Sequence, residues 1–158
     1  MLPQFSVLKK MYLGNILYGG VYNDLDVKQY LFETLEKQQL PDNATCILRM
    51  SAVMNVTTPE PGSQQGLKNY YYFYERDELL KYLKKMYGEP DQSNNAKADF
   101  SGKVGIMSFK VSGSESSEDC SVLLWNGNGV HQGKGPKYNQ SAQLWAAPTG
   151  MYWWMNNY

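Results

Sequence analysis

Apolar residues recur with a helical period in several stretches of the chain. The clearest stretch is residues 45–55, where Ile47, Met50, Val53 and Met54 repeat at helical spacing. This spacing gathers the side chains on one inward face of an α-helix. The same reasoning predicts further helices over residues 5–13, 24–38 and 77–87.

Short segments rich in aromatic and β-branched residues follow in the second half of the chain. We predict strands over residues 69–74, 104–111, 121–125 and 142–145, separated by polar loops rich in Gly, Ser and Pro. Helices first and strands afterwards, with one helix between them, predict an α+β fold: a helical layer against a mostly antiparallel sheet. We expect one domain over residues 1–158, with an aromatic tail at 149–158.

Charge and composition exclude several classes of partner. The chain has fifteen basic and fifteen acidic residues and a formal net charge of zero. We therefore expect no nucleic-acid partner, because no excess of positive charge is present to bind phosphates. No apolar run approaches the roughly 20 residues of a membrane span, so we expect no membrane partner. Two cysteines and one histidine are too few for a closed zinc site, and we expect no metal.

Cys46 is the candidate nucleophile. It lies at the start of the predicted helix 45–55, where unpaired N–H groups and the positive end of the helix dipole favour thiolate over thiol. Arg49 follows three residues later, close to the same helix face. Arg49 either anchors a carboxylate or holds the helix in the fold.

A cysteine hydrolase also needs a base, which is normally a histidine. The chain has a single histidine, His131, which lies among the glycines of residues 127–135. Two interpretations stay open. His131 is either a relocated base or an ordinary histidine of a solvent-exposed loop.

Several segments together resemble a known family. They are Thr45-Cys46-Ile47-Leu48-Arg49-Met50-Ser51, Tyr72-Phe73-Tyr74, Glu78-Leu79-Leu80-Lys81-Tyr82-Leu83, Tyr87-Gly88-Glu89-Pro90-Asp91, Phe100-Ser101-Gly102-Lys103-Val104-Gly105-Ile106-Met107 and Leu124-Trp125-Asn126-Gly127. Their order and spacing are similar to the fourth amidase-effector family of type VI secretion systems, which is related to NlpC-type papain-like amidases. The resemblance implies a papain-like fold, a Cys-His-Asp triad, no cofactor, and cleavage of peptidoglycan stem peptides between D-glutamate and diaminopimelate.

The resemblance carries the nucleophile to Cys46 but does not carry the rest of the triad. Ser121 occupies the family's histidine position, and Gln132 falls near its aspartate position. Serine cannot act as a base near neutral pH, and loss of the base removes most of a coupled triad's activity. We therefore expect a catalytically inactive amidase-like domain that serves as a structural or interaction subunit, for example in a cytoskeletal or organellar assembly. The alternative is an active cysteine amidase that cleaves stem peptides with Cys46 as nucleophile and His131 as base.

The aromatic tail is the predicted partner-binding segment. Trp153, Trp154 and Tyr158 lie in this tail, and an apolar cluster at a chain end favours docking on a protein partner. Residues 1–10 lack the apolar core of a signal peptide. We expect an intracellular location, with delivery to a bacterial periplasm under the alternative function.

Overall fold

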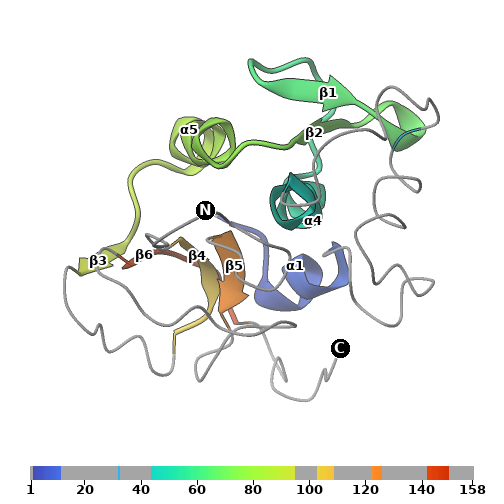
Figure 1. Ribbon diagram of the computed structural model, residues 1–158. Coiled ribbons are helices and arrows are strands. Elements are labelled where there is room, and N and C mark those ends of the chain that lie inside the picture. The colour runs from blue at the N-terminus through green and yellow to red at the C-terminus, as the bar shows by residue number, and fades with distance from the viewer. Residues whose placement is uncertain are drawn as a thin grey trace.

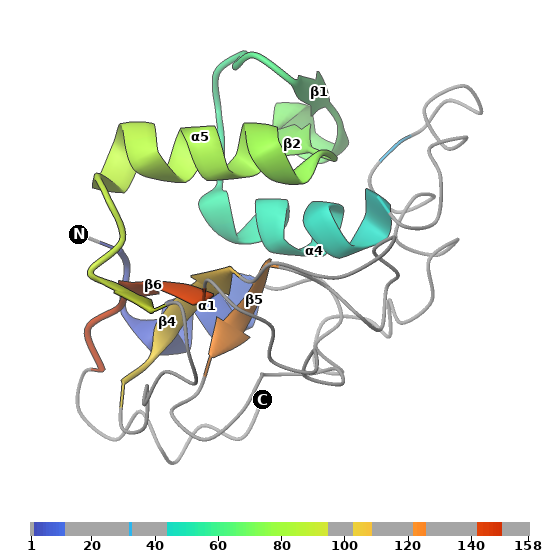
Figure 2. The same ribbon diagram turned by 60° about the vertical axis from the view of Figure 1, so that its left-hand side comes forward.

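The computed structural model describes residues 2–11, 32, 44–94, 103–108, 122–125 and 142–149. Three α-helices lie in these ranges: α1 (Phe5–Met11), α4 (Ala44–Met54) and α5 (Arg76–Tyr87). None of them combines the length and the apolar character needed to cross a bilayer. Figures 1 and 2 show α4 in the middle of the molecule, with α5 on one side and α1 on the other.

Two antiparallel sheets accompany these helices. The strands of the smaller sheet are β1 (Ser63–Gln65) and β2 (Tyr71–Phe73), which are joined through the 3-10 helix η1 (Leu67–Asn69). The strands of the larger sheet are β3 (Gln92–Asn94), β4 (Gly105–Ser108), β5 (Val122–Trp125) and β6 (Ala142–Ala146). Their spatial order is β3-β6-β4-β5, and every pair is antiparallel.

Close approach of β4 and β6 depends on a glycine. Gly105 opens β4 with a φ of +155° and lies opposite Ala146 of β6. A Cβ atom at this position would collide with the backbone oxygen of Trp145. Only glycine therefore allows the two central strands to pair here without strain.

The core lies on both faces of the larger sheet and extends to α4. All residues of β4 and β5 are buried, as expected for strands covered on both faces. The inward face predicted for α4 is buried as well: Ile47 is 1% exposed and Met50 is fully buried. Leu79 and Leu83 of α5 are fully buried in the same core.

The segment after α5 is bonded to β6. Gly88 ends α5 with a φ of +82°, and its N–H donates to the carbonyl of Lys84 at 2.9 Å. The Trp145 indole donates to the Gly88 carbonyl at 3.0 Å. Asp91 accepts a hydrogen bond from the Ala146 N–H at 2.8 Å. The motif at residues 87–91 thus turns the chain and attaches it to the sheet.

The predicted fold class is confirmed, and the differences from the predicted elements are local. α1, α4 and α5 lie where helices were predicted, and β2, β4, β5 and β6 lie within or overlap the predicted strands. The polar segments 57–66 and 89–99, where no strand is predicted, contain β1 and β3. These strands are short and polar, so only their pairing with β2 and β6 makes them recognisable. Of the predicted helix 24–38, residue 32 alone lies in the described ranges.

Candidate functional site

Cys46 is the third residue of α4 and lies in its first turn. The first four N–H groups of an α-helix have no partner within the helix, and the dipole places partial positive charge there. Both effects favour a thiolate at this position. The sequence-based placement of Cys46 at a helix N-terminus is therefore confirmed.

Helix α4 is held from two sides. One side joins the main core through Ile47 and Met50, and the other side contributes Leu48 to a second cluster. In this second cluster the rings of Phe32 and Tyr72 meet edge to face, with centroids 6.2 Å apart. A helix buried on opposite sides keeps a fixed orientation, which a nucleophile at its end requires.

Two polar residues of α4 are buried. The helical period of the apolar residues identified neither of them. Ser51 is 1% exposed, and its hydroxyl accepts a hydrogen bond of 2.7 Å from the Phe73 N–H of β2. Arg49 is 7% exposed. The sequence analysis predicts a role for Arg49 but none for Ser51, and the burial of both residues became evident only in the fold.

Strand β5 packs against α4. In Figure 2 the start of β5 lies below α4. Val122 is fully buried and begins this strand, directly after Ser121. Ser121 itself lies outside the described ranges, so its predicted place at the family's histidine position stays a prediction.

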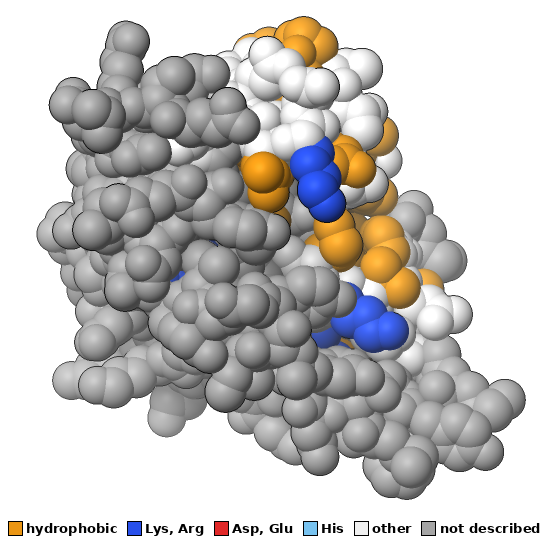
Figure 3. Space-filling view, turned by 90° about the vertical axis from the view of Figure 1, so that its right-hand side faces the viewer, with side chains coloured by type: hydrophobic (Ala, Val, Ile, Leu, Met, Phe, Trp, Pro, Cys, Tyr) orange, Lys and Arg blue, Asp and Glu red, His pale blue; other side chains and the backbone are white. Residues whose placement is uncertain are grey.

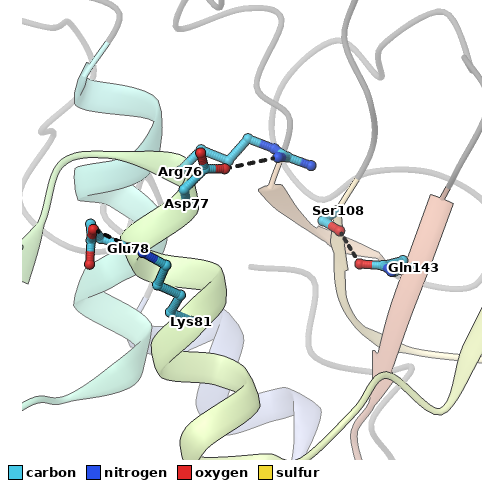
Figure 4. A network of polar contacts seen from close by, with 6 residues as sticks. All are labelled: Arg76, Asp77, Glu78, Lys81, Ser108 and Gln143. Atoms are coloured by element: carbon cyan, nitrogen blue, oxygen red, sulfur yellow. Dashed lines mark hydrogen bonds and ion pairs between the residues drawn. The ribbon is translucent and has the colours of Figure 1, made fainter.

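The same end of the sheet carries a polar pair. Ser108 lies opposite Val122 on one side and opposite Gln143 on the other. Its hydroxyl donates a long hydrogen bond of 3.5 Å to the Gln143 Oε1, and Figure 4 shows the two side chains pointing toward one another. Because β6 begins here at Ala142, the chain that follows His131 enters the sheet at the end where β5 begins.

Most of the predicted site residues fall outside the described ranges. They are Ser121, His131, Gln132, Trp153, Trp154 and Tyr158. Their assigned roles therefore stay predictions. In the described ranges, no cluster of three or more His, Cys, Asp or Glu side chains is arranged to hold a metal ion.

A separate pocket of about 150 Å³ lies between α5 and residues 60–61. Lys85 donates to both carboxylate oxygens of Glu60, at 2.9 and 3.1 Å, on its rim. Burial raises the pKa of Tyr82, and the nearby Tyr87 and Glu60 raise it further.

Another ion pair on α5, between Glu78 and Lys81 at 3.5 Å, is drawn in Figure 4. The pocket lining includes no cysteine, serine or histidine nucleophile.

Apolar side chains also reach the surface. Figure 3 shows hydrophobic side chains beside Lys and Arg side chains on one face of the described part of the molecule. On α1, Val7 and Met11 are 45% and 38% exposed and lie one turn apart. Scattered exposed residues of this kind are ordinary on a protein surface.

Comparison with known proteins finds similarity in structure alone. No protein-family model and no curated protein sequence matches the chain. The Tae4 effector of Salmonella Typhimurium, solved with the immunity protein Tai4, matches with a TM-score of 0.74 and 25% identity over 94% of this chain and 100% of that chain. The Salmonella typhimurium effector bound to Tai4 from Enterobacter cloacae matches with a TM-score of 0.73 and 25% identity, over 92% and 99% of the two chains. The Tae4 effector of Enterobacter cloacae has a TM-score of 0.72 at 21% identity, over 93% and 98%, and shows the shared fold.

These similarities correct the function expected from the sequence. We expected an inactive structural or interaction subunit, and this interpretation was wrong. The two Salmonella structures above, which match this chain along nearly their whole length, are of Tae4 effectors in complex with immunity proteins, and neither is described as a structural subunit. The error came from treating two substituted positions, Ser121 and Gln132, as decisive. The family resemblance itself is confirmed: the chain has the papain-like, NlpC-type fold of the Tae4 type VI amidase effectors.

Proposed function

We propose that the chain is a cysteine amidase effector that hydrolyses peptidoglycan stem peptides between D-glutamate and diaminopimelate. The observation that carries this proposal is the shared fold over 92–94% of the chain at 25% identity with Tae4 effectors. The position of Cys46 in the first turn of the central helix supports it. Under this proposal residues 1–158 form one catalytic domain that acts in the periplasm of a target cell.

In the proposed reaction, the Cys46 thiolate attacks the amide carbonyl carbon and forms a tetrahedral intermediate. Collapse of this intermediate breaks the C–N bond, and the leaving amine takes a proton from a general acid. Water then attacks the thioester, gives its proton to the base, and releases the carboxylate and the free thiolate. Each cycle therefore consumes one water and needs a group that both gives and takes a proton.

His131 is the proposed acid and base. It is the single histidine of the sequence, and imidazole titrates near neutral pH. The connection from β5 to β6 leaves the sheet after Trp125 and returns at Ala142, at the opposite end of the sheet. This end is where β5 begins beside α4, which supports a contribution from the connection that contains His131.

A protein partner is also part of the proposal. Solved Tae4 effectors are bound to Tai4 immunity proteins. We propose that this chain has an immunity protein of the same kind and that Trp153, Trp154 and Tyr158 of its tail contribute to partner binding. The aromatic character of the tail supports this assignment.

Mass spectrometry of purified muropeptides tests the activity. Incubation of stem peptides containing diaminopimelate with the wild-type chain is expected to release a diaminopimelate-bearing fragment with a new free amine. Cys46→Ala is expected to abolish release, and His131→Asn to reduce it at least about 100-fold. A wild-type chain without activity on these peptides, or a fully active Cys46→Ala variant, would refute the proposal.

A further inference from the structure

Arg49 is a buried arginine three residues after the proposed nucleophile on α4. The residue is 7% exposed, and its neighbours Leu48 and Met50 are fully buried. A guanidinium carries its charge throughout the physiological pH range. In surroundings of low polarity, that charge acts more strongly on nearby groups than it would in water.

Helix geometry sets the separation of Arg49 from Cys46. Both residues belong to α4, and they are three positions apart. Residues with this spacing are neighbours on a helix surface, with Cβ atoms about 5–6 Å apart. The Arg49 charge and the helix dipole therefore act on Cys46 in the same sense, since both favour a negative sulfur.

We propose that Arg49 stabilises the Cys46 thiolate and so takes the electrostatic part that an imidazolium has in a cysteine–histidine pair. This inference rests on the proposed function for the role of Cys46. By the family resemblance, Ser121 stands at the histidine position and is uncharged, so it cannot supply this charge. Arg49 acts through Cys46 and transfers no proton. It is a positioning residue, and proton transfer remains with His131.

The experiment measures the rate at which iodoacetamide alkylates Cys46 as a function of pH. Peptide mass spectrometry reads Cys46 separately from Cys120. The wild-type midpoint is expected well below the ordinary thiol pKa of about 8.5. Arg49→Met is expected to raise the midpoint by about one unit, because the stabilising charge is gone. The rate at pH 6.5 then falls about tenfold, while the rate at pH 9.5 changes less than about twofold.

Two control variants separate charge from other effects. Arg49→Lys retains a cation, so its pH midpoint for Cys46 alkylation is expected to stay close to the wild-type value. Lys81→Met removes one positive charge from α5, where the side chain is 73% exposed, and is expected to leave the midpoint unchanged. Circular dichroism establishes that each variant is folded. If Arg49→Met does not fold, Arg49→Gln, which retains hydrogen-bond donors, provides the same comparison.

Two results would overturn the inference. One is a wild-type alkylation midpoint near pH 8.5 for Cys46, and this measurement requires no variant. The other is a folded Arg49→Met or Arg49→Gln chain with the wild-type midpoint, which would assign the effect to the helix N-terminus alone. Failure of the proposed function looks different: the thiol midpoint is low and depends on Arg49, but stem peptides are not cleaved.

Discussion

At the scale of single residues, we propose that the chain divides between two residues the tasks that one histidine often performs. A cysteine hydrolase needs a positive charge beside the thiolate and a group that moves protons. Arg49 is buried one turn after Cys46 and suits the first task, whereas the one histidine, His131, suits the second. The serine at position 121 then no longer implies inactivity.

Restoring a histidine at position 121 tests this division. In a His131→Asn background, Ser121→His is expected to raise amide hydrolysis at least about tenfold, because a general base contributes about 100-fold or more when well placed. Ser121→Asn in the same background is the matched control and is expected to restore nothing. Muropeptide release measures both. Equal activity of the two variants would show that position 121 does not face the reacting groups.

At the scale of elements, the orientation of α4 depends on its attachment to β2. The Ser51 hydroxyl accepts a hydrogen bond from the Phe73 N–H in the buried interior. The edge-to-face contact of Phe32 and Tyr72 supports the helix from the same side. These contacts hold α4 against β2.

Ser51→Ala is expected to destabilise the fold by about 1–3 kcal/mol, because the Phe73 N–H would be left buried without an acceptor. Urea unfolding followed by circular dichroism measures the change. Ser63→Ala is the control: its hydroxyl is only part-buried where it accepts from the Glu60 N–H, and water can replace it. A Ser51→Ala chain no less stable than Ser63→Ala would contradict the role of this bond.

At the scale of the whole molecule, two tyrosines limit stability in alkali. Burial raises the pKa of Tyr87, and burial with the neighbouring Tyr87 and Glu60 raises that of Tyr82. The unfolded chain ionises these groups near pH 10, while the folded chain keeps them protonated longer. Their contribution to stability is therefore complete below about pH 10 and is lost as the pH rises further.

When the pH rises from 8 to 10.5, the urea concentration at the unfolding midpoint is expected to decrease in the wild type. It is expected to decrease less in a Tyr82→Phe, Tyr87→Phe variant. Equilibrium unfolding at both pH values measures it. An identical decrease in the two proteins would assign the alkaline loss to other groups.

The sequence by itself determined several local elements, including the helix that carries Cys46. Helical periodicity identified the helix around Cys46, and aromatic density identified the strand around Tyr72. Both signals arise within one short segment, where the repeat of side chains reports which face is buried. The family resemblance was likewise visible in short motifs.

Only the tertiary structure decided what lies beside these elements. It paired β6 with β4 rather than with β5, and it made strands of the polar segments at Ser63–Gln65 and Gln92–Asn94. It also buried Arg49 and Ser51. Such features depend on contacts between segments far apart in the chain, so no local period reports them. The physical reason is burial itself: a charged side chain acts more strongly on its neighbours once other elements exclude water from it.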